Sequence, residues 1–203
     1  MSEKYKFDTM SLHSGHVPDK ETGSRAVPIY QTTSYVFKDT DEAAALYNME
    51  VGGHLYTRIS NPTIATLEQR LASLDGGVSC VACSSGMAAM HLVVTAICSS
   101  GDHIVASNKM YGANINLLQH TMTRFGIKTD FVNPNDLEEI EKSIKPNTKL
   151  VFGEVIGNPG LDVMNVPEVA KICKKKNVPL AIDATFNTPY LMKPISHLSL
   201  IHI

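Results

Sequence analysis

The sequence predicts an α/β protein in which a mainly parallel sheet is covered by helices on both faces, preceded by an extended N-terminal arm. Short apolar runs typical of buried strands occupy residues 79–82, 103–106, 128–132, 149–153 and 180–182. Helical patterns lie between these runs at residues 87–97, 113–125, 136–144 and 166–176. Strands that alternate with helices at this spacing favour a parallel sheet that is buried on both faces.

The segment before the first predicted strand also carries helix signals. Residues 61–77 read NPTIATLEQRLASLDGG, with Pro62 near the start, leucines at helical spacing and a glycine pair as a stop. In the third helix of the alternating part, Asn135 is expected to be the N-cap, with acidic residues in the first turn.

Residues 1–60 show little regular alternation and hold Gly, Pro, Thr and Ser in clusters, which is typical of an extended arm. One short helix is expected around residues 41–48. The arm also carries apolar side chains that should pack on something, and a neighbouring subunit is a candidate: Val27, Ile29, Tyr30, Tyr35, Val36 and Phe37.

The composition argues against a nucleic-acid-binding, secreted or membrane-spanning protein. The chain has 203 residues, 43% of them apolar, a formal net charge of −2 and a pI of about 6.4. Its densest basic run, residues 174–176, is more typical of a solvated helix end than of a nucleic-acid patch. The first residues lack the apolar region of a signal peptide, and no segment approaches the ~18 apolar residues of a membrane span. We therefore expect a cytoplasmic protein.

Cys80 and Cys83 form a C-x-x-C pair, for which a redox or zinc role must be weighed. A zinc site would want a second pair at similar spacing, and the sequence offers none. We expect instead a strand with both sulfurs buried, and no metal ion.

The stretch ACSSGMAAMHLV follows the first predicted strand and opens a helix. Its small residues Ser84, Ser85 and Gly86 would let backbone N–H groups approach an anion, and a helix N-terminus adds a favourable dipole. The stretch fits neither G-x-G-x-x-G nor a Walker loop. A phosphate cradle and a plain helix cap with a glycine turn both remain open.

Two further stretches carry candidate binding residues. Tyr56 and Arg58 precede the Asn61-Pro62 break; Arg is a natural phosphate partner, and in an extended segment both side chains would point the same way. Tyr111 follows a strand-like run, where an aromatic ring can stack on a flat ligand. The alternatives are an ordinary surface arginine and a partly buried core tyrosine.

The last candidates follow the later strands. Asn158 lies after the run at 149–153, with Glu154, although Asn-Pro also marks a simple turn. Asp183 ends a buried run, where a carboxylate needs a cation or hydrogen-bond donors. The protonated ring nitrogen of pyridoxal phosphate (PLP) would satisfy Asp183, and the same ligand would account for the phosphate cradle, Arg58 and Tyr111.

These residues resemble the Cys/Met-metabolism family of PLP enzymes of fold type I. The motifs that match, in order, are GSRAVPIYQTTSYVF, YTRISNPT, SSGMAA, MYG, GNPGLDV and DATFNTPYL. The resemblance runs from about residue 7 to residue 194 and is strongest to the O-acetylhomoserine sulfhydrylases. It implies a PLP-binding α/β domain at residues 61–194, an inter-subunit arm at 1–60 and a tail at 195–203 outside the match.

The resemblance implies a role for each candidate near the cofactor. Gly86 and Met87 would donate backbone N–H groups to the PLP phosphate, with Ser85 beside them. Tyr111 would stack on the ring and assist proton transfer at the leaving group. Asp183 would hold the pyridine N–H. Further expected cofactor contacts are Asn158, near the ring hydroxyl, and Thr185.

The resemblance also implies a shared active site. Tyr56 and Arg58 would reach the phosphate of the neighbouring subunit, so that a homodimer forms the site and two dimers form a tetramer. The implied reaction is γ-replacement on O-acetyl-L-homoserine by sulfide or a thiol, giving homocysteine or methionine and acetate in sulfur amino-acid biosynthesis.

The chain departs from the family pattern in several places. The Ser-x-Thr-Lys segment that carries the PLP lysine has no counterpart here, and Lys193 is a poor substitute. We expect that lysine and the C-terminal domain to lie outside these residues, in a longer enzyme. Ala184 stands where the family usually has Asn.

Alternatives remain open both within the family and outside it. Within the family they are methionine γ-lyase and cystathionine γ-synthase or γ-lyase; the lack of a Cys after Tyr111-Gly112 weakens the first slightly. Outside enzymes, a non-catalytic fragment or partner subunit with the same fold would explain the missing lysine. A nucleotide-binding protein would leave Asp183 and Tyr111 unexplained.

Overall fold

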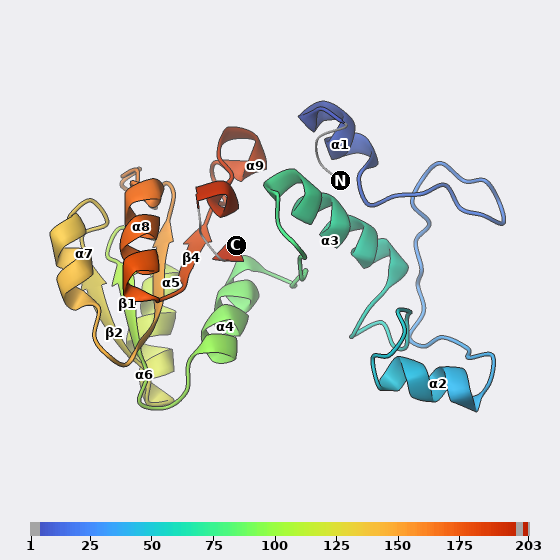
Figure 1. Ribbon diagram of the computed structural model, residues 1–203, viewed down its shortest axis with the longest axis horizontal. Helices are drawn as coiled ribbons and strands as arrows, with labels where there is room; N and C mark the ends of the chain where they lie inside the picture. Colours follow the sequence, from blue (N-terminus) through green and yellow to red (C-terminus); the bar gives the residue numbers. More distant parts are fainter. Residues whose placement is uncertain (1–4, 198–200, 203) are drawn as a thin grey trace. The chain divides into compact units, whose positions relative to one another are not determined.

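The computed structural model describes residues 5–197 and 201–202, and the chain divides into two compact units, Met1–Ala82 and Cys83–Ile203. The first unit carries three helices within its described residues, which are labelled in Figure 1: α1 (Phe7–His13), α2 (Thr40–Tyr47) and α3 (Pro62–Asp75). Long irregular segments connect them, as expected for residues 1–60. The division of the assembled protein into arm, domain and tail stays a prediction.

The sequence signals account for α3 and α2. The side chain of Asn61 accepts a hydrogen bond from the Thr63 backbone N–H at 2.9 Å, Pro62 opens α3, and Gly76 ends it in the left-handed conformation at φ 80°. Asp39 caps α2 in the same way. Helix α1 was not predicted, because it has only seven residues and no side-chain cap.

The second unit contains a five-stranded parallel sheet in the order β2-β1-β3-β4-β5. Its strands are β1 (His103–Ser107), β2 (Lys128–Val132), β3 (Thr148–Glu154), β4 (Leu180–Asp183) and β5 (Ile201–His202). The main helices are α4 (Gly86–Ile97), α5 (Gly112–Asn116), α6 (Met122–Arg124), α7 (Leu137–Ser143) and α8 (Val166–Lys176). A π-helical segment (Leu117–Thr121), α9 (Thr188–Leu191) and a 3-10 turn (Pro194–His197) complete the described elements. The predicted fold class is confirmed.

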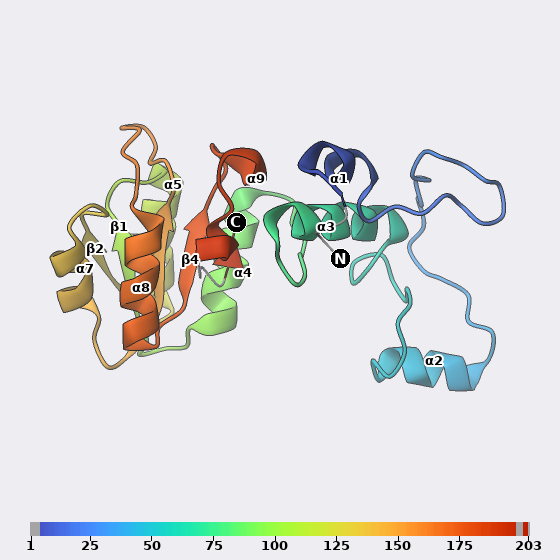
Figure 2. The ribbon, with the colours of Figure 1, turned by 45° about the horizontal axis from the view of Figure 1, so that its top comes forward.

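Helices cover both faces of this sheet, as Figures 1 and 2 show. Alternate strand residues pack toward opposite faces. Toward α4 and the helical segment after β1 lie Ile104, Ala106, Leu150, Phe152 and Ala181. Toward α7 and α8 lie Val105, Val132, Val151, Leu180 and Ile182. Burial on both faces explains the apolar runs in β1, β3 and β4, whereas the edge strand β2 (KTDFV) is only partly buried.

One predicted strand is wrong. Residues 79–82 form no strand, and Val81 is 76% exposed. The backbone N–H of Ala82 donates instead to Glu68 Oε1 on α3, at 2.8 Å. Cys80 and Cys83 are accordingly half-buried rather than enclosed in a strand.

Two helix details also differ from the prediction. The N-cap of α7 is Asp136, whose side chain accepts from the Glu139 N–H at 2.9 Å, and not Asn135. The helix predicted at residues 113–125 widens into a π-helical turn between α5 and α6. Such a turn inserts into an α-helix without a residue pattern of its own.

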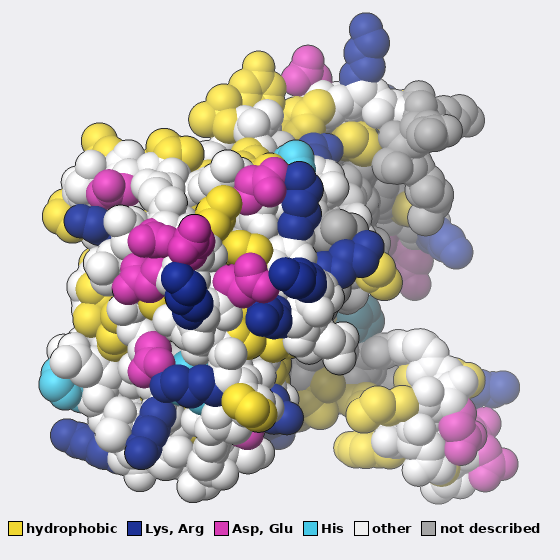
Figure 3. All heavy atoms as spheres, turned by 60° about the vertical axis from the view of Figure 1, so that its left-hand side comes forward, with side chains coloured by type: hydrophobic (Ala, Val, Ile, Leu, Met, Phe, Trp, Pro, Cys, Tyr) yellow, Lys and Arg dark blue, Asp and Glu magenta, His cyan; other side chains and the backbone are white. Residues whose placement is uncertain are grey.

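The run of lysines at the end of α8 is part of a mixed surface. Lys175 and Lys176 both pair with Glu141 of α7, at 2.8 and 3.4 Å. Figure 3 shows Lys and Arg side chains interspersed with Asp and Glu on this side of the molecule. The predicted solvated helix end is confirmed. Among the residues with a described placement, no helix is long and apolar enough to cross a membrane.

His103 lies buried at the amino ends of the strands. Its Nδ1 is 2.8 Å from Thr148 Oγ1, and its Nε2 is 3.3 Å from both Asp130 Oδ2 and Lys145 Nζ. Burial lowers the pKa of His103 below its ordinary value of 6.5, the positive charge of Lys145 lowers it further, and Asp130 opposes both. The folded protein therefore favours the neutral imidazole.

The free energy of unfolding should consequently decrease in acid. Because the folded pKa lies below the unfolded one, the contribution of His103 is complete above pH about 6.5 and is lost as the pH falls through the folded pKa. Urea denaturation between pH 8 and pH 5 measures this slope. His103→Gln should reduce the slope in that window; an unchanged slope would contradict the assignment to His103.

Candidate active site

The strand order reverses between β1 and β3, and polar residues gather where these two strands end. The chain leaves β1 to form β2 on one side and then returns to form β3 on the other. In open parallel sheets, ligands bind at the carboxyl ends of the strands beside such a reversal. Tyr111 follows β1, and Glu154 and Asn158 end and follow β3. The structure thus brings two predicted site residues, Tyr111 and Asn158, to one place.

Glu154 joins the two loops at this point. Its Oε1 accepts hydrogen bonds from the backbone N–H of Tyr111 at 2.7 Å and from Asn114 Nδ2 at 3.2 Å. Its Oε2 accepts one from the backbone N–H of Asn158 at 3.2 Å. Glu154 is only 7% exposed, and burial raises the pKa of its carboxyl; the nearby charge of Asp183 raises it too, while the Tyr111, Asn114 and Asn158 donors oppose the rise.

Asp183 ends the neighbouring strand β4 and is the register partner of Glu154. Its Oδ1 accepts hydrogen bonds from Thr185 N at 2.9 Å and Thr185 Oγ1 at 2.5 Å. Because both of these bonds end on Oδ1, the other oxygen is available to accept a ligand N–H. Thr185, another predicted site residue, therefore orients the Asp183 carboxylate.

Ser85, Gly86 and Met87 form the first turn of α4. The side chain of Ser85 caps the helix by accepting from Ala88 N at 3.1 Å. A short segment links the end of α4 to the start of β1, so that α4 runs antiparallel to this strand. The N-terminus of α4 therefore lies at the carboxyl edge of the sheet. A Cβ added at Gly86 would meet no atom within 4 Å, which leaves open space for an anion at the helix dipole. The predicted helix cap is confirmed, and the geometry also permits the phosphate cradle.

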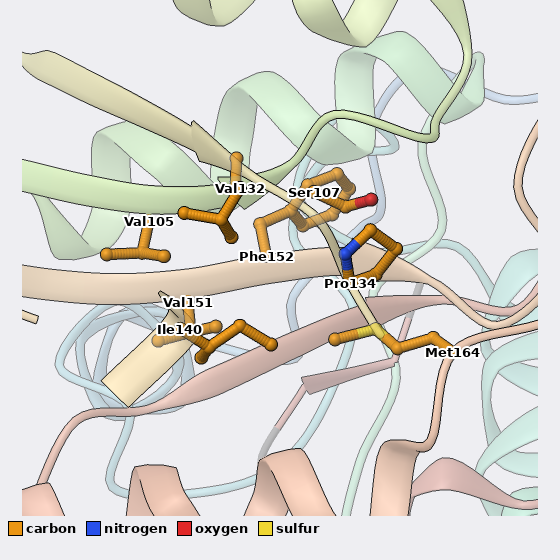
Figure 4. A pocket seen from close by; sticks show the side chains of 9 residues that line it. Val105, Ser107, Val132, Pro134, Ile140, Val151, Phe152 and Met164 are labelled. Atoms are coloured by element: carbon orange, nitrogen blue, oxygen red, sulfur yellow. The ribbon is translucent and has the colours of Figure 1, made fainter. Parts of the chain in front are cut away.

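The core beneath this edge is closed. Figure 4 shows side chains that line this part of the core, and Val105, Val132 and Met164 belong to the cluster on the α7 and α8 face of the sheet. They leave no room for a water molecule. A ligand must therefore bind above the strand ends, among the loops, and not within the sheet.

The loops after β1 and β3 touch at Gly157. A Cβ added there would lie 2.2 Å from the backbone oxygen of Lys109, and neither backbone can yield easily. Gly157→Ala should therefore displace the loop that carries Tyr111 and lower the free energy of unfolding by about 1–3 kcal/mol. Urea denaturation checks the stability, and near-ultraviolet circular dichroism checks the tyrosine environment.

Gly160→Ala is the matched control, three residues further along. A Cβ there would meet Asp162 Oδ2 at 2.5 Å, and this side-chain end can rotate away. The change should stay within about 0.5 kcal/mol. Equal effects of the two substitutions would contradict the close approach at Gly157.

Tyr56 and Arg58 belong to the other unit, Met1–Ala82. The segment is a turn and not extended: the N–H groups of Ile59 and Ser60 donate to the Tyr56 oxygen at 2.8 and 3.0 Å. The guanidinium of Arg58 lies over the Tyr56 ring, 5.6 Å from its centroid, and both side chains are exposed. The two side chains are thus adjacent, although not by the predicted alternation.

Sequence reasoning noticed Glu154 without assigning it a role, and it missed Asn114. Asn114 is 3% exposed inside the first turn of α5, and the mixed polar and apolar sequence of this helix gives no signal that marks it as buried. Only the structure shows that its amide reaches Glu154, 40 residues away in the sequence.

The carboxylate, aromatic ring and helix N-terminus at the ends of parallel strands are those of a cofactor-dependent α/β enzyme. The chain belongs to the Cys/Met metabolism PLP-dependent enzyme family, whose model matches residues 8–200. The match includes residues 195–200, which the sequence analysis placed outside the resemblance.

Curated relatives and solved structures agree with this membership. The chain is 46% identical over 197 residues to the O-acetyl-L-homoserine sulfhydrylase of Leptospira meyeri and 42% identical over 196 residues to the homocysteine synthase of Schizosaccharomyces pombe. These matches cover 97% and 96% of this chain but 45% and 46% of those proteins. The chain therefore spans about half the length of the curated relatives it matches.

A solved structure gives the same picture. An O-acetylhomoserine (thiol)-lyase of Campylobacter jejuni, solved with N'-pyridoxyl-lysine-5'-monophosphate at its position 205, matches with a TM-score of 0.93 and 38% identity. The match covers 96% of this chain and 48% of that one. The fold type I architecture is thus confirmed, and PLP is the cofactor of the family.

The residues at the carboxyl edge fit PLP. An acceptor for a ring N–H is available on Asp183, and the open first turn of α4 offers N–H groups for a phosphate. Tyr111 is 48% exposed, which leaves its ring free to meet a flat ligand. The individual contacts of these residues with PLP stay predictions.

Proposed function

We propose that the protein containing this chain catalyses γ-replacement on O-acetyl-L-homoserine with sulfide or a thiol, giving homocysteine or methionine and acetate. The observation that carries the proposal is the 46% identity, over 97% of the chain, to an O-acetyl-L-homoserine sulfhydrylase. A homocysteine/cysteine synthase of Saccharomyces cerevisiae, 40% identical over 194 residues, supports the same reaction class. Members of the family act on amino-acid substrates of sulfur metabolism.

In this proposal, residues of this chain hold the phosphate, the ring nitrogen and the ring hydroxyl of the cofactor. PLP supplies an electron sink for charge that develops next to its bound substrate. Ser85, Gly86 and Met87 would bind the phosphate, and Asp183, oriented by Thr185, would keep the ring nitrogen protonated. Asn158 would lie near the ring hydroxyl.

Tyr111 is the catalytic residue that we assign to this chain. Its ring stacks on the cofactor, and its phenol moves a proton at the leaving acetate oxygen. The lysine that would bind PLP and take up the substrate proton is assigned to no residue of this chain. Lys193, ten positions after Asp183, is not proposed for that role.

We further propose that two copies share each active site. Tyr56 and Arg58 would reach the phosphate bound by the neighbouring subunit, and two such dimers would form a tetramer. Exposed apolar side chains on the arm support this: Ile29 is 79% and Val36 99% exposed. Such side chains gain stability when another surface covers them. The cytoplasmic location stays a prediction.

The test uses the full-length protein encoded by the gene, purified with PLP. O-acetyl-L-homoserine and sulfide should yield homocysteine and acetate in equal amounts, detected by thiol derivatisation and chromatography. In parallel, L-methionine without sulfide tests the lyase alternative, since a methionine γ-lyase of Treponema denticola is 36% identical over 195 residues. Release of ammonia and a 2-oxo acid from methionine, with no homocysteine in the first assay, would overturn the proposal.

A further inference from the structure

We propose that Glu154 is a positioning residue for this reaction: its carboxylate fixes the loops of Tyr111 and Asn158 around the cofactor ring. The inference rests on the proposed function and extends it. Glu154 itself lies behind the loops, 7% exposed, and acts through the residues that it binds.

The geometry at Glu154 is that of a clamp. Three N–H donors converge on one carboxylate, two on Oε1 and one on Oε2. Two of the donors are the backbone N–H groups of Tyr111 and Asn158, which follow β1 and β3 at the reversal of strand order. The third, Asn114, ties the first turn of α5 to the same oxygen that holds Tyr111.

This clamp sets where the Tyr111 ring lies. Tyr111 is the N-cap of α5, and its carbonyl accepts from Asn114 N at 2.9 Å and Ile115 N at 3.3 Å. The position of the Tyr111 carbonyl is thus fixed by the helix, and the position of its N–H is fixed by Glu154. Because the ring is attached between these two groups, a shift of the carboxylate moves the ring relative to the sheet.

A buried acid at this position is better explained by function than by stability. Desolvation of a carboxylate is unfavourable, and Asp183 adds like-charge repulsion from the adjacent strand. A well-packed apolar side chain would avoid both penalties. What an apolar side chain lacks is the ability to accept hydrogen bonds from two loops at once.

Glu154→Gln separates these properties. Glutamine has a similar size, but its amide has one acceptor oxygen and one donor nitrogen, so it can hold the Tyr111 side or the Asn158 side and not both. Glu139→Gln is the matched control: Glu139 Oε2 accepts from the Asn133 backbone N–H at 2.9 Å in the loop after β2. Tyr111→Phe identifies the residue through which Glu154 acts.

The experiment uses the full-length holoenzyme and three readouts. Glu154→Gln should still bind PLP, but the visible circular dichroism of the bound cofactor should fall by about half or more, since the ring environment has moved. It should lower kcat by about 10–100-fold with KM within about twofold. Glu139→Gln should change neither.

A double-mutant cycle tests the route of action. If Glu154 acts through Tyr111, Glu154→Gln should reduce kcat much less in the Tyr111→Phe background than in the wild type. Equal reductions in both backgrounds, or an unchanged cofactor dichroism in Glu154→Gln, would overturn the inference. An absent PLP band in the wild type would instead overturn the proposed function, and this inference with it.

A measurement on the wild type covers the case in which Glu154→Gln does not fold. Hydrogen exchange of the cofactor-free protein should show the Tyr111 and Asn158 amides protected, because both donate to a buried carboxylate. Exchange at the rate of an unbonded turn at both amides would overturn the clamp. Protection at both would support it.

Discussion

Asp183→Asn is expected to reduce the γ-replacement activity of the full-length holoenzyme by at least about 10²-fold, the range for loss of one preorganised electrostatic partner. The amide keeps an oxygen that can accept from Thr185 N and Oγ1, so the loop geometry should persist. It loses the negative charge that would keep the pyridine nitrogen protonated. The measurement is kcat for homocysteine formation, with the absorbance spectrum of the bound cofactor as a second readout.

Asp102→Asn provides the control at the opposite edge of the sheet. Asp102 precedes β1, and its Oδ2 accepts from the Ser99 backbone N–H at 2.7 Å. The substitution is the same isosteric change beside a strand, but far from the proposed cofactor. Its activity should stay within about twofold of the wild type, because effects of remote surface changes are small. If Asp183→Asn also remained within that range, Asp183 would not be the ring-nitrogen partner.

Phe152→Ala is expected to lower the free energy of unfolding by about 3–5 kcal/mol, the range for truncation of a buried aromatic side chain. Phe152 lies in β3, fully buried between the sheet and the helices on the α4 face. Strand β3 pairs with β1 and β4, so the surrounding backbone has little freedom to close the cavity. Urea denaturation of the protein, with and without PLP, gives the measurement.

Phe125→Ala is the matched control for this change. Phe125 follows α6 and is 61% exposed, so truncation should cost no more than about 0.5 kcal/mol. A similar loss from both substitutions would contradict the description of Phe152 as a core residue.

Strands β1, β3 and β4 could be predicted because burial on both faces of the sheet requires a run of apolar residues in each of them. The strand predicted at residues 128–132 and the helix predicted at 166–176 match β2 and α8 at both ends. The run at 79–82 looks similar but has no partner strand, and pairing is not visible in a local pattern. The predicted N-cap of α7, Asn135, is one residue before the observed N-cap, Asp136, and both residue types are good N-caps.

The candidate site could be predicted only in part, for a related reason. Asp183 directly follows a strand-like run and Tyr111 lies in the short loop after another, so local position identified them. The roles of Glu154 and Asn114 depend on hydrogen bonds between residues that are 40 or more positions apart in the sequence. Such contacts depend on the order in which the strands assemble, which no single segment of the sequence contains.

The reversal of strand order also has a consequence for when the site appears during synthesis. Tyr111 meets its acceptor 43 positions later, and β2 and α7 lie in between. The residues of β3 must therefore leave the ribosome, and this long loop must close, before the two halves of the site can meet. Contacts between residues so far apart in the sequence form slowly during folding. Chains interrupted on the ribosome before β3 would hold Tyr111 and the start of α4 but no assembled place for the cofactor ring.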